Sequence, residues 1–349
     1  MPKRVGEVGE ASRGHPQTAA VSSVVTPEVG CLARGYKFVY GSLGGIGNDP
    51  PPGGGRGESA LATVETVRLS DGRALCARRW TGAGPGTLVI LHGLLDSSEG
   101  WACVGEHIAS TRIAFDLPGF GHSDAPRLGS IAGYAQDVAE GLRLLGVERF
   151  TLIGHSLGGA VATALAELMP ERVAALVLLA PAGFGRIHLA EAVSIPGVRS
   201  VVEAALPVAL SRRLAVTAGY MTMVANGARP EREVVDRVTS RGGALVNGAR
   251  EGTRAVVNAG RSRHAFHRRR FSYRGPVFAI RRDQDRLVPV AHRHGVRAAF
   301  PHARIEVWPG MGHHPLRERY EKLIAVIARA ARAAGQRTAR PPLSQAEAA

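Results

Sequence analysis

The sequence predicts an α/β fold in which a mostly parallel central sheet carries helices on both faces and a helical cap interrupts the order of the strands. Three observations predict it. Short runs that are apolar throughout recur along the chain, as is typical of strands buried on both faces of a parallel sheet. Segments with helical character separate these runs, as parallel connections require. One long interval, residues 182–274, lacks any strand pattern and shows apolar residues at helical spacing instead.

The first 60 residues are expected to form a flexible extension. They show little periodicity, and residues 41–57 are rich in Gly and Pro, which disfavours regular structure. Order is expected to begin at residue 61 with a β-hairpin. Its first strand, Ala62–Leu69, contains alternating β-branched residues, the turn is Ser70–Arg73, and the second strand ends at Trp80.

The buried strands divide the rest of the chain. The first part of the core is expected over residues 61–181, the helical cap over 182–274, the second part of the core over 275–335, and a polar tail over 336–349. A final amphipathic helix is expected from Leu316 to about Ala334. The predicted buried strands are 88–91, 113–115, 150–153, 176–179, 277–280 and 305–308.

Composition excludes several classes of protein. The chain has 349 residues and is 45% hydrophobic, enough for a large core. Its three cysteines, Cys31, Cys76 and Cys103, match no disulfide or zinc spacing. Residues 1–30 contain no apolar run of signal-peptide length, and no window is long enough to cross a membrane. We therefore expect a cytoplasmic protein that needs neither a metal ion nor an organic cofactor.

The positive charge is concentrated in the predicted cap. The net charge is +15, and residues 182–274 contain 16 Arg against 6 Asp or Glu. Such a segment can attract an anionic substrate, a membrane surface or a nucleic acid, or its arginines can simply occupy solvated helix faces. No aromatic residues interleave Arg268–Arg270 as single-strand binding requires, so nucleic acid is the least favoured partner.

One pentapeptide points to nucleophilic catalysis. Gly154-His155-Ser156-Leu157-Gly158 fits G-x-S-x-G, the sharp turn between a strand and a helix that exposes a serine hydroxyl. It directly follows the predicted strand ending at Ile153 and precedes a helix that begins with small residues. Ser156 is therefore the candidate nucleophile, and the alternative is a Gly-rich turn without chemistry.

The chain resembles the α/β-hydrolase family from about Leu61 to Ala334, with the cap the least similar part. Four motifs carry the resemblance in the family's order: Leu91-His92-Gly93-Leu94-Leu95; Asp116-Leu117-Pro118-Gly119-Phe120-Gly121-His122-Ser123; the turn around Ser156; and an acid and a histidine near the end. A serine at this turn also argues against the epoxide hydrolases and haloalkane dehalogenases of the family, which place Asp at the same position.

The resemblance implies a catalytic triad. The family's acid usually sits four residues before a Pro, which selects Asp285 and leaves Asp283 as runner-up; its base follows a Gly, which selects His313 over His314. The oxyanion donors would be the backbone N–H groups of Leu157 and, by resemblance, Leu94. Arg281-Arg282 departs from the family, which has an aromatic or small residue and then Gly. His92, Asp116 and His122 are interpreted as structural loop residues.

These residues predict a serine hydrolase that cleaves a carboxylic ester or related acyl bond through an acyl-enzyme. The expected partner is a small-molecule acyl substrate with an apolar part, roofed by the cap segment from Val193 to Leu210. The same triad also supports acyl transfer, thioester cleavage and C–C bond hydrolysis. Residues 178–185 resemble acyltransferase-like domains of dehydrogenase complexes. A non-catalytic binder of an anionic ligand is the remaining alternative.

Overall fold

The computed structural model describes residues 21–26, 62–223, 229–230, 232–240, 242–261, 266–314 and 320–338. Nine strands form one sheet in the order β1-β2-β3-β5-β4-β6-β7-β8-β9. The strands are β1 (Val21–Thr26), β2 (Ala62–Arg68), β3 (Ala74–Trp80), β4 (Gly84–Leu91), β5 (Ser110–Phe115), β6 (Phe150–His155), β7 (Val173–Leu179), β8 (Val277–Arg282) and β9 (Arg304–Trp308).

The sheet is parallel from β5 through β9 and antiparallel at its other edge. β3 pairs antiparallel with β2 and with β5, and all pairs from β5 onward in the spatial order are parallel. The predictions of a mostly parallel sheet and of a hairpin formed by β2 and β3 are confirmed. Each predicted buried strand lies within an observed one, as apolar runs in strands covered on both faces predict. The exception in burial is β9, an edge strand of which only Trp308 is buried.

Strand β1 differs from the expectation for the N-terminal 60 residues. Residues 21–26 pair antiparallel with β2, in a register that places Val21 opposite Val67. The segment VSSVVT is rich in β-branched residues, which favour a strand once a partner edge exists. Its pairing is non-local, which explains why the local pattern did not reveal it. The rest of the expected extension lies outside the described residues.

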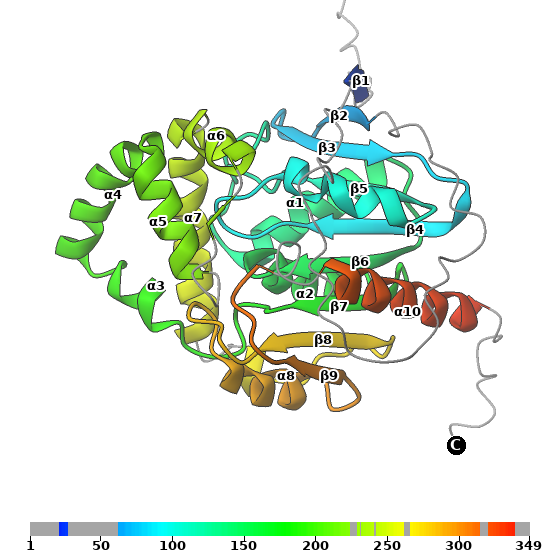
Figure 1. The fold of residues 1–349 in the computed structure, drawn as a ribbon. Helices are drawn as coiled ribbons and strands as arrows, with labels where there is room; N and C mark the ends of the chain where they lie inside the picture. Colours follow the sequence, from blue (N-terminus) through cyan, green and yellow to red (C-terminus); the bar gives the residue numbers. More distant parts are fainter. Residues whose placement is uncertain are drawn as a thin grey trace, which may run out of the picture.

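Helices cover both faces of the sheet (Figure 1). On one face, α1 (Ile131–Leu144), α2 (Leu157–Leu168) and α8 (Arg293–Ala299) pack into a core that includes Phe115 and Leu152. On the other, α10 (Tyr320–Thr338) and the 3-10 helix η2 (Ser98–His107) pack into a second core around Ile153 and Val177. The predicted C-terminal helix corresponds to α10; its expected start at Leu316 lies outside the described residues.

The insertion between β7 and β8 is helical. It contains α3 (His188–Ala192), α4 (Pro196–Ser211), α5 (Arg213–Met223), α6 (Arg232–Ser240) and α7 (Gly242–Arg261), and its described residues contain no strand. These helices lie together at one end of the molecule, beyond the carboxyl ends of the parallel strands (Figure 1). α7 lies nearest the sheet, and α4 packs on it. The cap therefore covers the edge of the sheet where loops carry the predicted site.

Candidate active site

The candidate nucleophile lies at a strained turn between β6 and α2. Ser156 has φ 53° and ψ −115°, a backbone conformation that costs a non-glycine residue about 1–3 kcal/mol. Surrounding hydrogen bonds hold it there: the Ser156 N–H donates to the Leu179 carbonyl at 2.9 Å, and the Ser156 carbonyl accepts from the Ala182 N–H at 3.0 Å. The neighbouring strand β7 thus maintains the turn.

The glycines around Ser156 are required by close approach of the backbone. A Cβ atom on Gly158 would lie 2.3 Å from the Leu91 carbonyl oxygen, and one on Gly159 would lie 2.8 Å from Cα of Pro181. A Cβ on Gly154 would lie 2.7 Å from Cβ of Ala162. Helix α2 therefore packs directly against β4 and β6, as the small residues after the motif indicated.

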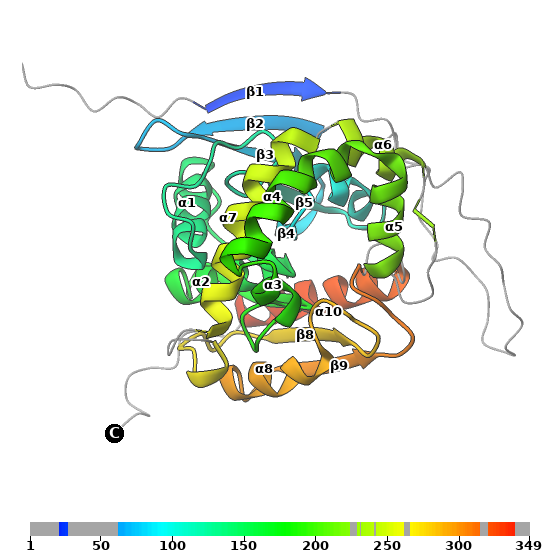
Figure 2. The same cartoon turned by 90° about the vertical axis from the view of Figure 1, so that its left-hand side faces the viewer.

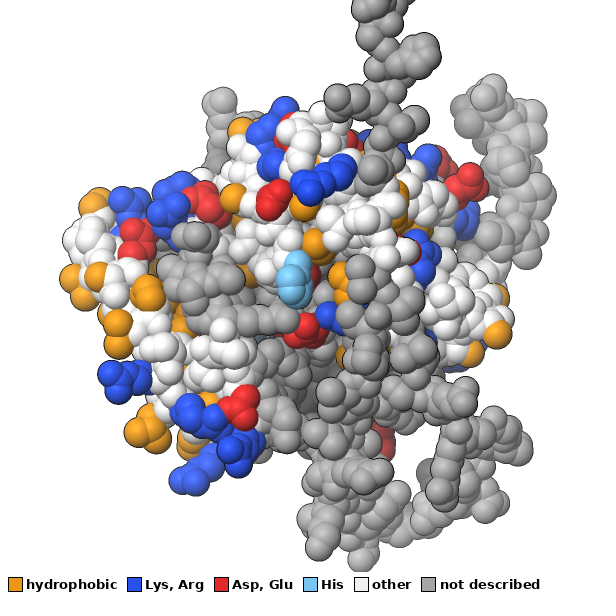
Figure 3. Space-filling view, turned by 90° about the horizontal axis from the view of Figure 1, so that it is seen from above, with side chains coloured by type: hydrophobic (Ala, Val, Ile, Leu, Met, Phe, Trp, Pro, Cys, Tyr) orange, Lys and Arg blue, Asp and Glu red, His pale blue; other side chains and the backbone are white. Residues whose placement is uncertain are grey.

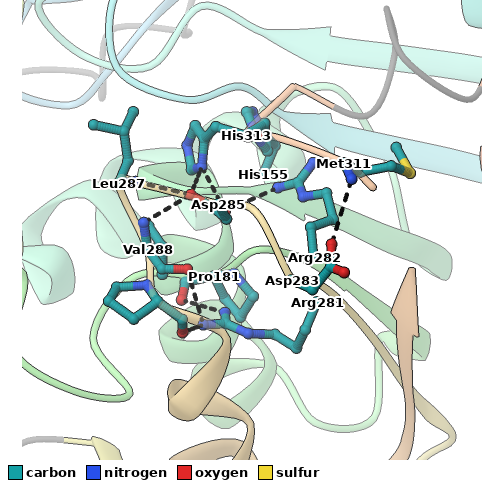
Figure 4. A network of polar contacts seen from close by, with 11 residues as sticks. His155, Pro181, Arg281, Arg282, Asp283, Asp285, Leu287, Val288, Met311 and His313 are labelled. Atoms are coloured by element: carbon teal, nitrogen blue, oxygen red, sulfur yellow. Dashed lines mark hydrogen bonds and ion pairs between the residues drawn. The ribbon is translucent and has the colours of Figure 1, made fainter. Parts of the chain in front are cut away.

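Asp285 and His313 come together from two neighbouring strands. Asp285 follows β8, His313 follows β9, and these strands pair in parallel, so the loops after them leave the same edge of the sheet. His313 Nδ1 lies 3.0 Å from Oδ1 and 2.9 Å from Oδ2 of Asp285 (Figure 4). A carboxylate only accepts hydrogen bonds, so Nδ1 carries a proton, and in the neutral imidazole Nε2 is the nitrogen with the lone pair.

The two alternative residues occupy other positions. Asp283 is exposed, and its Oδ1 accepts hydrogen bonds from the backbone N–H groups of Gly310 and Met311 at 2.8 and 3.4 Å. His314 Nε2 lies 4.0 Å from Oδ2 of Asp96. Asp283 therefore stabilises the loop before His313, whereas Asp285 contacts the imidazole itself.

Asp285 is buried but remains ionised. Burial alone would raise its pKa, but His313, the Arg282 guanidinium and the backbone N–H of Val288 hold the pKa of this carboxyl well below its ordinary value. Oδ1 accepts from the N–H groups of Leu287 at 3.0 Å and Val288 at 2.8 Å. Arg282 lies 3.6 Å from Oδ2. The negative charge is thus fixed behind the imidazole.

The unexpected Arg281-Arg282 pair is almost fully buried, and the two side chains point in different directions (Figure 4). Arg282 reaches Asp285. Arg281 donates to the carbonyls of Pro181 at 3.2 Å and Pro289 at 2.7 Å. It therefore links the loop that carries Asp285 to the segment that follows β7, and burial lowers the pKa of Arg281 to about 10.

His155, the residue before the nucleophile, contacts His313. The sequence did not single out this contact. Nε2 of His155 lies 3.0 Å from the His313 carbonyl oxygen, and the two imidazole rings are 4.9 Å apart. Burial, together with His313 and Arg282, holds the pKa of His155 well below its ordinary value, so the neutral ring donates from Nε2. The variable position of G-x-S-x-G thereby joins the turn to the His313 loop.

Leu94 and Leu157 converge beneath the cap. A Cβ atom on Gly252 of α7 would lie 2.7 Å from Cδ2 of Leu94 and 2.9 Å from Cδ2 of Leu157. A glycine at this point lets α7 approach both loops. Within the expected roof, Val193 to Leu210, the side chains of Val198 and Val201 are exposed, whereas Leu206 and Leu210 pack against the core cluster that contains Leu157. The cap helix in contact with the candidate oxyanion residues is α7.

The loops behind the site are held by buried polar groups. Asp116 accepts from the backbone N–H groups of Ser98 at 2.7 Å and His122 at 3.0 Å. His92 Nε2 accepts from the Leu117 N–H at 2.9 Å. These contacts lie within and between the loops after β4 and β5, in keeping with a structural interpretation of His92, Asp116 and His122.

The described residues were also compared with the requirements of a metal site and of a membrane-spanning helix. Among the described side chains, His, Cys, Asp and Glu form no group of three or more arranged to hold a metal ion. Within the same described ranges, no helix combines the length and apolar character needed to cross a membrane.

Comparison with known proteins places the chain in a family. Residues 86–208 match the model of the alpha/beta hydrolase fold. An uncharacterized protein of Mycobacterium tuberculosis is 31% identical over 265 residues, covering 72% of this chain and 77% of the relative. The acetyltransferase component of an acetoin cleaving system from Cupriavidus necator is 29% identical, over 77% of this chain and 69% of that protein.

Solved structures agree in fold. A putative lipase from Acinetobacter baumannii superposes with a TM-score of 0.66 at 17% identity, covering 80% of this chain and 93% of the lipase. The epoxide hydrolase CorEH superposes with a TM-score of 0.62 at 20% identity, covering 77% and 98%. With the sheet order, the turn at Ser156 and the family model in agreement, the chain belongs to the α/β-hydrolase fold family.

Proposed function

We propose that this protein is a serine hydrolase that cleaves a carboxylic ester or related acyl bond, with Ser156, His313 and Asp285 as its catalytic triad. The observation that carries the proposal is the buried His313–Asp285 pair beside the strained turn at Ser156. A serine hydroxyl is a weak nucleophile at neutral pH and needs such an oriented base. We also expect the enzyme to be cytoplasmic.

Each group has a defined role in the proposed mechanism. His313 Nε2 takes the Ser156 proton as the hydroxyl attacks the acyl carbon, and the imidazolium then protonates the leaving group. Water, activated by the same nitrogen, releases the acid and restores Ser156. The ionised Asp285 stabilises the imidazolium. The backbone N–H of Leu157, at the start of α2, and that of Leu94 donate to the oxyanion.

A chemical label and an ester series test the proposal together. Wild type and Ser156→Ala are treated with a fluorophosphonate probe, the modified residue is located by mass spectrometry, and turnover of p-nitrophenyl esters of increasing chain length is measured. We expect labelling only at Ser156 and no turnover by the variant. Retained turnover in a folded Ser156→Ala protein would refute the assignment. A folded wild type that takes no label and turns over no ester would favour a non-catalytic binder.

Acyl transfer is the second candidate, because the relative from Cupriavidus necator is named as an acetyltransferase component. Transfer and hydrolysis share the acyl-serine and differ in the group that attacks it. Products formed in the presence of a competing alcohol or thiol separate the two. Acceptor ester or thioester exceeding free acid would favour transfer, whereas free acid alone would favour hydrolysis. Thioester and C–C substrates belong in the same comparison, since the triad also serves those reactions.

A further inference from the structure

Exposed apolar side chains are concentrated on the cap. Among the described residues ten large apolar side chains are exposed, and six of them lie between residues 189 and 214. Val201 is 68% exposed and Leu214 is 86% exposed. The six are Leu189, Ile195, Val198, Val201, Val208 and Leu214. Single exposed apolar residues need no explanation, but a cluster of this kind marks an interaction surface.

The cluster follows one face of α4. Ile195, Val198, Val201 and Val208 are spaced by three, three and seven residues, so they lie along one side of the helix. Leu210, on another side, is buried in the core. A helix at the surface of a soluble protein usually has a polar outer face. Helix α4 is apolar on its covered face and on its exposed face.

This surface does not line the candidate active site. Figure 2 shows α3 and α4 in front of α7, on the side turned away from the sheet. α7 is the helix that contacts Leu94 and Leu157, and α4 packs on α7. Figure 3 shows hydrophobic side chains beside Lys and Arg at this outer end of the molecule. A substrate held at Ser156 would therefore leave the outer face of α4 uncovered.

The charges near the cluster are mainly positive. Between residues 186 and 223 the chain has four Arg and two Glu. Glu191 is buried against Arg186, and Glu203 is paired with Arg199 at 3.8 Å. Arg212, at the end of α4, is exposed, and Arg213, the first residue of α5, is exposed and paired with Asp236. The whole insertion, residues 182–274, has 16 Arg against 6 acidic residues. A second copy of this face would bring like charges together, whereas an anionic surface would complement them.

We propose that the outer face of α3, α4 and α5 docks on a phospholipid bilayer that contains anionic lipid. Apolar side chains with arginines at their edges have the composition of an interfacial helix, which lies in the plane of the bilayer surface. The arginines would contact lipid phosphates and the valines would enter the boundary between headgroups and acyl chains. The proposed docking is peripheral, because an interfacial helix lies on the bilayer surface and does not span it. The proposal goes beyond acyl-bond cleavage and does not depend on it.

Vesicle flotation of the full chain tests the proposal. The vesicles are pure phosphatidylcholine, or phosphatidylcholine with one fifth phosphatidylglycerol. We expect the wild type to float with the anionic vesicles at low salt, and raised salt to reduce the bound fraction because it screens the arginines. Val198→Asp/Val201→Asp should lower the bound fraction at least tenfold. Leu168→Asp, which adds a charge at an apolar side chain 47% exposed on α2, should bind like the wild type.

Further variants separate the contributions. Arg199→Gln/Arg212→Gln should weaken binding to the anionic vesicles more than binding to neutral ones. Ser156→Ala should bind as the wild type does, so a failure of the proposed catalysis leaves this result unaffected. Circular dichroism spectra matching the wild type establish that each variant is folded.

Three outcomes would overturn the docking proposal. One is a folded wild type that floats with neither kind of vesicle. Another is equal binding by the wild type and Val198→Asp/Val201→Asp. The third is a dimeric mass by light scattering that becomes monomeric in the double variant, because it would assign the face to a second copy of the chain.

Discussion

The Arg282 guanidinium lies 3.6 Å from Oδ2 of Asp285, and both side chains are completely buried. Arg281, the residue before, is also fully buried. Two buried cations thus lie close to the ionised carboxylate in the loop after β8. An uncompensated buried charge costs several kcal/mol. Asp285 therefore has a role in stability as well as its proposed role in orienting His313.

Asp285→Asn should destabilise the fold as well as reduce activity. Removing the carboxylate takes away the negative charge 3.6 Å from the buried Arg282 guanidinium, and loss of one member of a buried pair costs about 3–5 kcal/mol. Asp285→Asn/Arg282→Leu should regain much of the free energy of unfolding, measured in urea, without regaining ester turnover. A double variant no more stable than Asp285→Asn would contradict the electrostatic account.

Substitution of Asp285 and of Asp283 should have very different effects on kcat/KM. Asp285→Asn should lower kcat/KM by about 10³–10⁴-fold, as loss of the orienting acid does in serine triads. Asp283→Asn should remain within a few-fold of the wild type, because an amide oxygen can still accept from the Gly310 N–H that Asp283 binds. Equal losses in both variants would mean that the order of the loop matters more than the identity of the acid.

Asp116 should contribute to stability at neutral pH and lose that contribution in acid. Burial would raise its pKa, but hydrogen bonds from His122 and from the Ser98 N–H lower it from 3.8 to about 2. A lowered pKa stabilises the fold above the unfolded value, and the effect, about 2 kcal/mol in total, is lost as pH falls from about 4 to about 2. In urea unfolding at several pH values, the stability advantage of the wild type over Asp116→Asn should shrink over this interval. If the free energies of unfolding of the wild type and Asp116→Asn changed with pH in parallel, the proposed contribution of Asp116 would be contradicted.

Gly158→Ala should distort the nucleophile turn. The added methyl group would lie 2.3 Å from the Leu91 carbonyl oxygen and 2.4 Å from that of His92, and both are backbone atoms that cannot rotate away. We expect a loss of about 2 kcal/mol or more in stability together with loss of fluorophosphonate labelling. Gly197→Ala, where a Cβ atom meets nothing within 4 Å, is the matched control. A labelled, fully stable Gly158→Ala protein would show that the turn tolerates a side chain.

The sequence by itself determined the central sheet, the helical insertion and the order of the site residues. Apolar runs predict the strands of a covered sheet, although β9 is only partly buried because it lies at the edge. The small residues around Ser156 are needed by the close contact of β6 with α2. The family resemblance selected Asp285 and His313, which the structure brings together.

Other features were decided only by the tertiary structure, because they depend on partners far apart in the chain. Strand β1 exists through its pairing with β2. Arginine side chains are mostly exposed in proteins, yet carbonyl groups and Asp285 hold Arg281 and Arg282 in the interior. The arrangement of the cap is also non-local: helical spacing shows that α4 has apolar residues, and only its packing on α7 determines which of them face the solvent.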